Sequence, residues 1–429
     1  MITGCLAISL VFGGTASEML DLEVDPPTGP SSFALELEPD GDGVLATWIE
    51  PIAGGGSIRC SRLSFEDSTP TWSRPSTVAS GNELFLNWAD RPKVRRSHDG
   101  SLLAHHLRKI SKGTYAYGVR IGRSTDDGAS WQDLGWLHDD QRAVEHGFAS
   151  MIVGPRGTTA AWLDGRQMTE QKAGDEHGHA HASGSMSLRT TVIPSEPDGI
   201  PTSIGLDARV CECCDTDMAM TSKGPIIVYR DRGPNEERDI SIVRLIDGSW
   251  STPAPVHRDG WIIDGCPVNG PSVATSRDTV AVVWFTAAPG SDEDPAMPRV
   301  LVARSTDDGA TFEPPNVLSS TTIGRTDLVS LPDGGFLACW ADTREPSLVG
   351  VPTDRDPRMG SVALSRISAE GTIGPTDLLA PIELGRRSGF PRMAVIPANE
   401  VDASPARILV AWRSEADDRI VATMIDPTD

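Results

Sequence analysis

A short apolar run that ends in a ring-bearing side chain recurs along this chain at nearly even spacing. The rings belong to Trp48, His106, Trp162, Tyr229, Trp284, Trp340 and Trp412. Successive rings are 58, 56, 67, 55, 56 and 72 residues apart. Spacing this regular is typical of one structural unit that is repeated and buries its faces against its neighbours. The repeat therefore predicts seven copies of a single unit.

Each unit combines several short β-rich runs. In the third unit, an apolar run over 148–153 is followed by a turn at 154–157, the ring-bearing run, and another run over 187–192. Such runs, bounded by Gly, Pro and Asp, are typical of antiparallel strands, and no stretch shows sustained helical periodicity. We therefore predict an all-β fold, a β-propeller of seven blades, with six blades as the alternative if the outer units merge.

Two outer turns carry the same motif. Residues 124–131 have the sequence Ser-Thr-Asp-Asp-Gly-Ala-Ser-Trp, residues 305–312 repeat it with Phe in the last position, and 247–250 is a shorter copy. We expect the Asp to cap the turn, Gly to take a positive φ, and the aromatic ring to pin the hairpin. The pattern S-x-D-x-G-x-x-W resembles the Asp box, or BNR repeat, of the sialidase (neuraminidase) superfamily. That resemblance implies a sialidase-like propeller.

Composition limits the partners and the number of domains. The formal net charge of −22 disfavours binding to nucleic acid and to anionic membrane surfaces. The repeat extends over 33–429, which predicts a single propeller domain preceded by a linker over 19–32. We expect a monomer whose ligand is a metal ion or a small acidic molecule.

Residues 1–18 have the features of an export segment. An apolar run over 6–12 is followed by small residues, as at the end of a secretory signal. Residues 2–5 are also similar to a lipobox, in which Cys5 would carry a lipid anchor. No other segment is long enough to span a membrane. We expect a periplasmic or secreted protein; an ordinary first strand of a cytosolic protein is the alternative.

Propeller geometry brings distant loops together on one face. Residues before the first strand of each blade, and residues after the second strand, surround the same central funnel. Acidic and basic side chains at these positions are candidates for proton transfer and for binding an anionic ligand. These candidate catalytic residues are Asp90, Asp164, Arg230, Arg325 and Arg392.

The cysteines predict a second kind of site at the same funnel. Cys211, Cys213 and Cys214 precede the fourth blade, Cys266 precedes the fifth, and His146 precedes the third. Thiolate and imidazole ligands together suit Cu(I) or Zn(II), so a copper or zinc site is the leading hypothesis. A disulfide from Cys211 or Cys214 to Cys266 is the alternative in an oxidising compartment, and thiol redox chemistry is another.

Three further imidazoles lie in the loop after the second strand of the third blade. His177, His179 and His181 alternate with small residues, so all three can reach one ion. We expect them to be outer metal ligands that deliver an ion to the thiols or cover it. A solvated loop with incidental histidines is the alternative.

The resemblance to sialidases also implies a chemistry, which this chain matches poorly. Family members bind a carboxylate with three arginines and use a Tyr nucleophile activated by Glu, with Asp as the acid. The family Tyr lies late in the chain, whereas the three tyrosines here are Tyr115, Tyr117 and Tyr229. Tyr229 takes a ring position of the repeat, and the other two are expected at the start of a third strand, away from the channel. The Arg-Ile-Pro motif is missing.

Four runs, 145–148, 162–166, 229–232 and 266–271, resemble a group of bacterial sialidase-like propellers that carry a Cys-rich loop and have no assigned activity.

The sequence as a whole leaves three functional hypotheses. The first is metal handling or redox chemistry at a Cys/His site. The second is an exo-sialidase-type glycoside hydrolase, or a lyase, acting on acidic sugars. The third is a non-catalytic binding propeller with structural disulfides.

Overall fold

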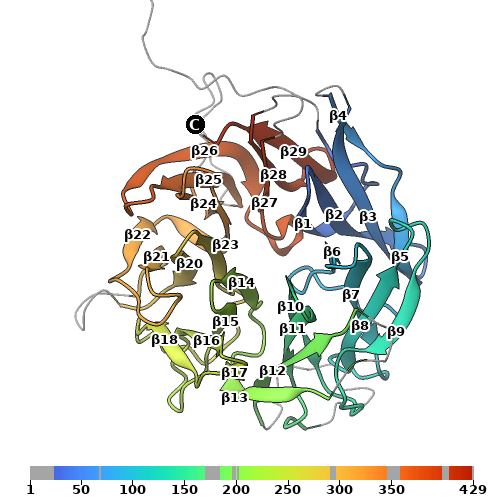
Figure 1. Ribbon diagram of the computed structural model, residues 1–429, viewed down its shortest axis with the longest axis horizontal. Coiled ribbons are helices and arrows are strands. Elements are labelled where there is room, and N and C mark those ends of the chain that lie inside the picture. Colours follow the sequence, from blue (N-terminus) through green and yellow to red (C-terminus); the bar gives the residue numbers. More distant parts are fainter. Residues whose placement is uncertain are drawn as a thin grey trace, which may run out of the picture.

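Seven small antiparallel sheets surround one axis (Figure 1). This computed structural model describes residues 24–66, 69–169, 184–195, 200, 202–289, 296–344, 358–398 and 405–427. Each sheet is one blade, and the blades follow one another around the ring in sequence order. The prediction of a seven-bladed, all-β propeller is confirmed, and the six-bladed alternative is wrong.

The first three blades are formed by consecutive strands. Blade one consists of β1 (Phe33–Asp40), β2 (Gly43–Ile52), β3 (Gly55–Glu66), β4 (Thr69–Trp72) and β5 (Ser76–Gly81). Blade two consists of β6 (Lys93–Arg96), β7 (Leu102–Lys109), β8 (Tyr117–Ser124) and β9 (Gln132–Trp136). Blade three consists of β10 (His146–Gly154), β11 (Gly157–Asp164), β12 (Met186–Ile193) and β13 (Ile204–Val210).

The remaining four blades complete the ring. Blade four consists of β14 (Asp217–Thr221), β15 (Gly224–Arg230), β16 (Ile240–Ile246), β17 (Ser249–Trp250) and β18 (Ala254–His257). Blade five consists of β19 (Ser272–Ser276), β20 (Thr279–Thr286), β21 (Arg299–Ser305) and β22 (Asn316–Ser319). Blade six consists of β23 (Thr322–Ser330), β24 (Phe336–Asp342), β25 (Met359–Ile367) and β26 (Ile373–Glu383). Blade seven consists of β27 (Arg392–Ile396), β28 (Arg407–Ser414) and β29 (Arg419–Ile425).

The repeated rings form the core between blades. Trp162, Tyr229, Trp284 and Trp340 are fully buried, each at 0% exposure. Each of these rings packs with apolar side chains of its own blade and of the blade before it. Trp48 joins blade one to blade seven in the same way. Each of these five rings is covered by a neighbouring blade, so the apolar core lies between the blades; Trp412 is partly buried in the cluster between blades six and seven.

The two Asp-box turns have the same hydrogen-bond pattern. Asp126 Oδ1 accepts from Ser124 Oγ at 2.8 Å and from the Ser130 main-chain N–H at 2.9 Å. The corresponding bonds of Asp307, to residues 305 and 311, are 2.7 and 2.9 Å long. Gly128 and Gly309 have φ values of 86° and 76°. The expected roles of Asp and Gly in these turns are therefore confirmed.

Residues 24–32 fasten the first blade to the last. Asp25 Oδ1 accepts a 2.8 Å hydrogen bond from the Ala422 main-chain N–H in β29, and Asp25 Oδ2 lies 2.7 Å from Arg419 Nη2. On the other side, Trp72 Nε1 donates to the Val24 carbonyl at 2.9 Å. Blades one and seven accordingly lie side by side (Figure 1).

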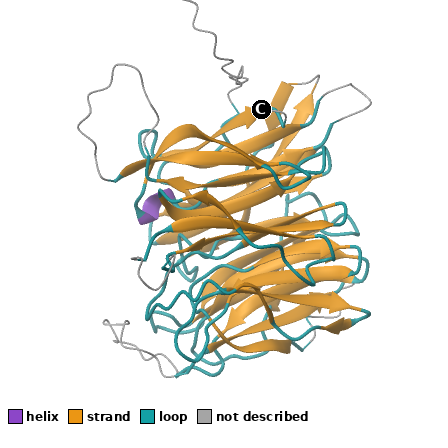
Figure 2. Cartoon of the chain, turned by 90° about the vertical axis from the view of Figure 1, so that its left-hand side faces the viewer, coloured by secondary structure: helices purple, strands orange, loops and turns teal. Residues whose placement is uncertain are grey.

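Strands dominate the molecule when it is seen from the side (Figure 2). The short 3-10 helix η1 (Arg386–Ser388) is the only helix among the described residues, and it precedes blade seven. No helix in the described part of the chain is long and apolar enough to cross a bilayer.

Candidate functional site

Left-handed backbone occurs at the entries to several inner strands, as well as in outer turns. Ala34, Phe148, Val268 and Arg325 have φ values between 50° and 60°, and Gly389 has 62°. The first strands of blades one, three and six also have register shifts at these points. A left-handed backbone costs a non-glycine residue about 1–2 kcal/mol and is often found at functional sites. The strain lies on the face where the sequence predicts a funnel.

Paired charges fill the centre of the ring. Arg91 Nε lies 3.0 Å from Glu36 Oε2, and Arg91 Nη2 lies 2.5 Å from Asp215 Oδ2. Arg392, a predicted anion ligand, lies 2.9 Å from Asp327 Oδ1 and 3.4 Å from Glu36 Oε1. The cavity that these residues line has a volume of about 50 Å³. The charge of Arg392 is therefore already matched within the protein.

Arg230, another predicted anion ligand, is held by the main chain. Its side chain is 1% exposed, and its three nitrogens donate at 2.5–2.9 Å to the carbonyl oxygens of Asn269, Arg238 and Phe285. These bonds join the end of β15 to the loop before β19 and to β20. The geometry makes Arg230 a brace between blades four and five.

Arg325 differs from the other predicted arginines because its described partners include no carboxylate. Its Nη1 donates to Ser388 Oγ at 2.8 Å and to the Gly389 carbonyl at 3.0 Å. Its guanidinium carbon lies 5.1 Å from the centre of the Trp88 ring, which stacks on the Phe390 ring at 5.9 Å. Burial lowers the pKa of Arg325 to about 10. An unmatched cation therefore lies beside two aromatic rings at the funnel face.

The two predicted acids have opposite protonation behaviour. Burial, together with nearby carboxylates, raises the pKa of Asp90 well above its ordinary value; its Oδ2 accepts a 2.7 Å bond from the Phe148 N–H. Burial opposes ionisation of Asp164 as well, but His146 and Arg166 hold its pKa well below the usual range. Asp90 is therefore favoured as a protonated acid, and Asp164 as a permanent carboxylate.

Tyr117 is more involved than its sequence position suggests. It begins β8, the third strand of its blade, as expected. However, its hydroxyl donates to Glu145 Oε1 in the loop that enters blade three. Burial raises the pKa of Glu145 to about 7 despite this bond. The expectation that Tyr117 lies apart from the funnel loops is therefore corrected: Tyr117 contacts a carboxyl group that titrates near neutrality.

His146 does not join the thiols, contrary to expectation. Its ring stacks on His138, with 3.9 Å between the ring centres. Its Nδ1 lies 3.3 Å from Asp164 Oδ2, and its Nε2 lies 3.4 Å from Asp140 Oδ2. The buried His146 ring therefore lies between two carboxylates and is separate from the thiols. The predicted outer ligands His177, His179 and His181 lie outside the described residues.

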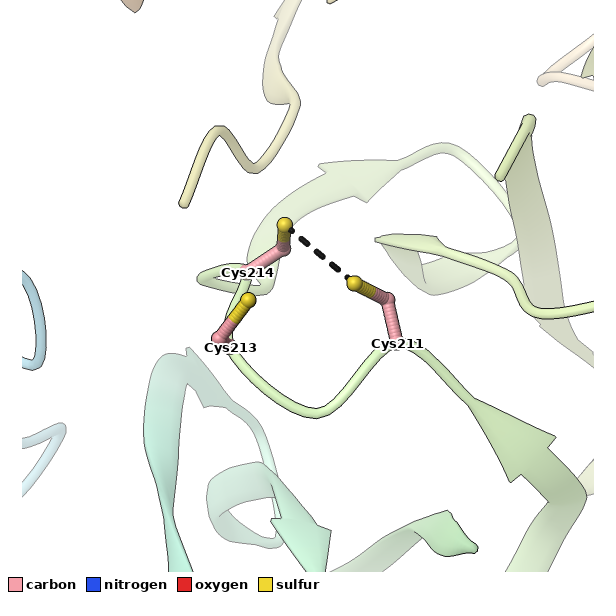
Figure 3. A group of neighbouring side chains, drawn as sticks. All are labelled: Cys211, Cys213 and Cys214. Atoms are coloured by element: carbon pink, nitrogen blue, oxygen red, sulfur yellow. Dashed lines mark hydrogen bonds between the residues drawn. The ribbon is translucent and has the colours of Figure 1, made fainter. Parts of the chain in front are cut away.

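Three of the predicted metal ligands do converge (Figure 3). The Cys211 and Cys214 sulfurs are 3.5 Å apart, and with Cys213 all three sulfurs lie within 4.8 Å of one another. Cys266 is exposed, whereas Cys211 and Cys214 are buried. All four are free thiols in this structure, so the alternative disulfide is not formed. We call Cys211, Cys213 and Cys214 the thiol cluster.

The surroundings of the thiol cluster favour negative charge on sulfur. The Asn269 main-chain N–H donates to Cys214 Sγ at 3.4 Å. Burial opposes ionisation of Cys211, but the neighbouring thiols and the charges of Arg238 and Arg230 hold its pKa well below the ordinary value. Cys213 and Cys214 have raised pKa values because of burial and that neighbouring charge. The three thiols therefore titrate as one interacting group, with Arg238 and Arg230 favouring negative charge on it.

Sequence reasoning missed one residue that connects the two halves of the site. Asn269 donates from its main chain to the thiol cluster, and its Oδ1 accepts a 2.7 Å bond from the Arg325 N–H. Its carbonyl also accepts from Arg230. The only signal in the sequence is the position of Asn269 between Pro267 and Pro271. Two nearby prolines restrict the backbone, so they indicate a loop with a fixed conformation in which a buried Asn needs hydrogen-bond partners.

Comparison with the known protein families and with curated proteins finds no match. Solved structures do share the architecture. A PL25 ulvan lyase superposes with a TM-score of 0.55 at 9% identity, covering 96% of each chain. The α-L-arabinofuranosidase of Fusarium graminearum gives 0.48 at 11% identity, over 95% of this chain and 97% of that one. NanB sialidase from Streptococcus pneumoniae gives 0.42 at 9% identity, over 95% and 71%. At these identities the likeness concerns the fold alone, a seven-bladed propeller.

Proposed function

We propose that this protein is a carbohydrate-active enzyme, a lyase or glycoside hydrolase that acts on acidic sugars at the funnel face. The observation that carries the proposal is Arg325, a cation without a carboxylate among its described partners, next to Trp88. A guanidinium binds a sugar carboxylate through two parallel hydrogen bonds, and an aromatic face packs on a sugar ring. The ulvan lyase of similar fold is bound to a ligand that contains GlcA, a sugar with a carboxylate.

Two titratable groups near this position can move protons. Asp90 is two residues from Trp88 and favours the protonated form. The Tyr117–Glu145 pair titrates near neutral pH at the next blade entry. General acids and bases work best when their pKa lies near the operating pH. In this proposal Arg325 binds the carboxylate, Asp90 is the acid, and the Tyr117–Glu145 pair accepts a proton.

The test compares Arg325→Gln with Arg387→Gln. Both changes remove one positive charge near η1, but Arg387 is exposed. Binding and turnover are measured on oligosaccharides of glucuronic, galacturonic and sialic acid, with neutral oligosaccharides as ligand controls. We expect Arg325→Gln to lose at least about tenfold in affinity or turnover, equivalent to about 1.4 kcal/mol, and Arg387→Gln to behave as wild type. If no acidic glycan is bound or cleaved, the proposal fails.

We also propose that the thiol cluster binds a soft metal ion, copper or zinc, for metal handling or redox chemistry. The observation in favour is the convergence of three sulfurs within 4.8 Å. Metal content and free thiols are measured on protein purified without oxygen. We expect about one ion per chain, absent from the Cys213→Ser/Cys214→Ser double variant and retained in Cys60→Ala, whose sulfur lies in blade one. Metal retained by the double variant contradicts this second proposal.

A further inference from the structure

We infer that the thiol cluster is a three-coordinate Cu(I) site, loaded through Cys266; this rests on the soft-metal function proposed above. Among the described His, Cys, Asp and Glu side chains, the three thiols are the only group of three or more whose ligand atoms converge this closely. Structural zinc takes four ligands in a tetrahedron. A set of three soft sulfurs without a fourth ligand favours Cu(I), which thiolates select.

The sulfur separations leave room for one ion. With metal–sulfur bonds of about 2.3 Å, sulfurs are about 3.8 Å apart around a tetrahedral ion and about 4.0 Å apart around a trigonal one. The Cys211–Cys214 separation is 3.5 Å, and no separation within the cluster exceeds 4.8 Å. The three sulfurs face a common space (Figure 3). A shift of about half an ångström per sulfur would therefore complete a trigonal site.

The negative charge of the site has cations nearby. Three thiolates and Cu(I) leave a charge of −2 on the site, one unit more negative than with Zn(II). Arg230 is buried, and its nitrogens are bonded to carbonyl oxygens rather than carboxylates, so its charge is available to balance the thiolates. Arg238 is 2% exposed and its charge acts on Cys211, although it also pairs with Glu212 and Glu236. The Asn269 N–H adds a donor to Cys214.

The four cysteines form a gradient of exposure. Cys266 is exposed, Cys213 is partly buried, and Cys211 and Cys214 are buried. Cys266 is three residues before Asn269, whose main-chain N–H donates to Cys214 Sγ, so the chain brings the Cys266 thiol near the cluster, where it interacts with Cys213. An arriving Cu(I) would bind Cys266 first and then pass to Cys213 as one copper–sulfur bond forms and the other breaks. The thiol protons leave to solvent and the oxidation state of copper does not change.

The experiment titrates the reduced full-length chain with Cu(I), and separately with Zn(II), against chromophoric chelators in the absence of oxygen. We expect one Cu(I) per chain, with sulfur as the only ligand in the copper X-ray absorption spectrum. The variants Cys211→Ser, Cys213→Ser and Cys214→Ser should each weaken Cu(I) binding by more than about 100-fold. Loss of a residue that only supports a metal ligand typically costs less than this. Cys266→Ser should leave the affinity within about threefold and slow the loading. Cys60→Ala is the control.

The outcomes separate this inference from the broader proposal. Tight binding of one Zn(II) that is lost equally in Cys266→Ser and in the three cluster variants would show a zinc site with four sulfur ligands. This result would overturn the assignment of Cu(I), but the proposed soft-metal function would stand. Failure to bind either ion would overturn both. The thermal unfolding temperature of each variant is also measured, because a variant that does not fold would lose the metal for that reason alone. A variant that unfolds is replaced by Cys→Ala at the same position, for which the same affinities are expected.

Discussion

Asp164 shows how a single buried carboxylate holds a blade together. It accepts a hydrogen bond of 2.9 Å from Trp162 Nε1 and one of 2.7 Å from Arg166 Nε. Asp342 repeats the arrangement in blade six, with 3.0 Å to Trp340 Nε1. A Trp-x-Asp-x-Arg run at the end of a second strand is therefore a local clamp. This role explains why Asp164, predicted as an acid, is better understood as a structural residue.

We predict that Asp164→Asn lowers the free energy of unfolding by about 1–3 kcal/mol, because it weakens the hydrogen bonds that this buried carboxylate accepts from Trp162 and Arg166. Asp139→Asn is the matched control, since Asp139 pairs with the same Arg166 at 2.6 Å but near the surface. Its loss should cost less than about 1 kcal/mol. Urea unfolding at neutral pH measures both. The difference in unfolding free energy between the two variants should shrink as the pH falls below about 4. A carboxyl group whose pKa is lowered by folding contributes its full stability above the pKa of the unfolded chain and loses it as the pH falls toward the folded pKa.

Glu145 has the opposite linkage. Its pKa is raised to about 7, so the folded protein binds a proton that the unfolded chain releases above about 4.5. The stability associated with this group is therefore complete below that pH and is lost as the pH rises to about 7. We predict that Glu145→Gln removes this loss and stabilises the protein by about 1–3 kcal/mol at pH 8 relative to pH 5. Parallel wild-type and variant unfolding curves across this range would contradict the prediction.

The sequence could not rank the funnel arginines. Arg230 ends a second strand, whereas Arg325 and Arg392 lie at first strands, and the partners of all three are distant in the chain. Arg392 pairs with Asp327 of another blade, whereas Arg325 contacts the Trp88 ring before blade two and the Gly389 carbonyl before blade seven. How the blades align with one another decides which arginine lies next to a carboxylate. This alignment cannot be predicted from a single sequence.

At the scale of elements, the loop before β19 packs closely against the entry to blade four. Gly270 packs so closely that a Cβ there would lie 2.1 Å from the Asp215 carbonyl oxygen. Both groups belong to the entries of neighbouring blades. The Cys-Pro-Val-Asn-Gly-Pro run was recognised in the sequence as an entry loop. Its close contact with blade four was not predictable, because it depends on where the inner strands meet.

We predict that Gly270→Ala destabilises the protein by more than about 2 kcal/mol, since main-chain atoms must move to accept the methyl group. Gly265→Ala in the same loop is the control. A Cβ at Gly265 would meet only the Ile263 side chain, at 3.8 Å, so its effect should stay within about 0.5 kcal/mol. Equal midpoints for the two variants in urea would refute the close contact.

For the whole molecule, the period of the rings was sufficient to predict the fold. Seven aromatic or imidazole positions at similar spacing predict seven equivalent blades, and six of these rings pack against a neighbouring blade. The closure of the ring was not predictable in the same way. The contacts of residues 24–32 with blades one and seven depend on single polar groups that have no periodicity.

We predict that Asp25→Ala weakens this closure by about 1–2 kcal/mol, through loss of its bonds to Arg419 and the Ala422 N–H. Hydrogen exchange should accelerate most in β29, next to the released contact. Asp42→Ala is the control, because Asp42 forms an exposed pair with Arg62 at 2.7 Å, which should contribute less than about 1 kcal/mol. Uniform exchange changes across all blades would contradict a role in closure.

The paired charges on the axis also decide how a long ligand can approach. A ring of seven blades suggests an open tunnel, but the space among Glu36, Arg91, Asp215 and Arg392 is about 50 Å³, room for a water molecule or two and much too narrow for a sugar unit. A polysaccharide therefore cannot be threaded through this protein. A polymeric substrate of the proposed kind would therefore lie across the ring and leave from the side on which it arrived, so the width of one face would limit how many sugar units contact the protein.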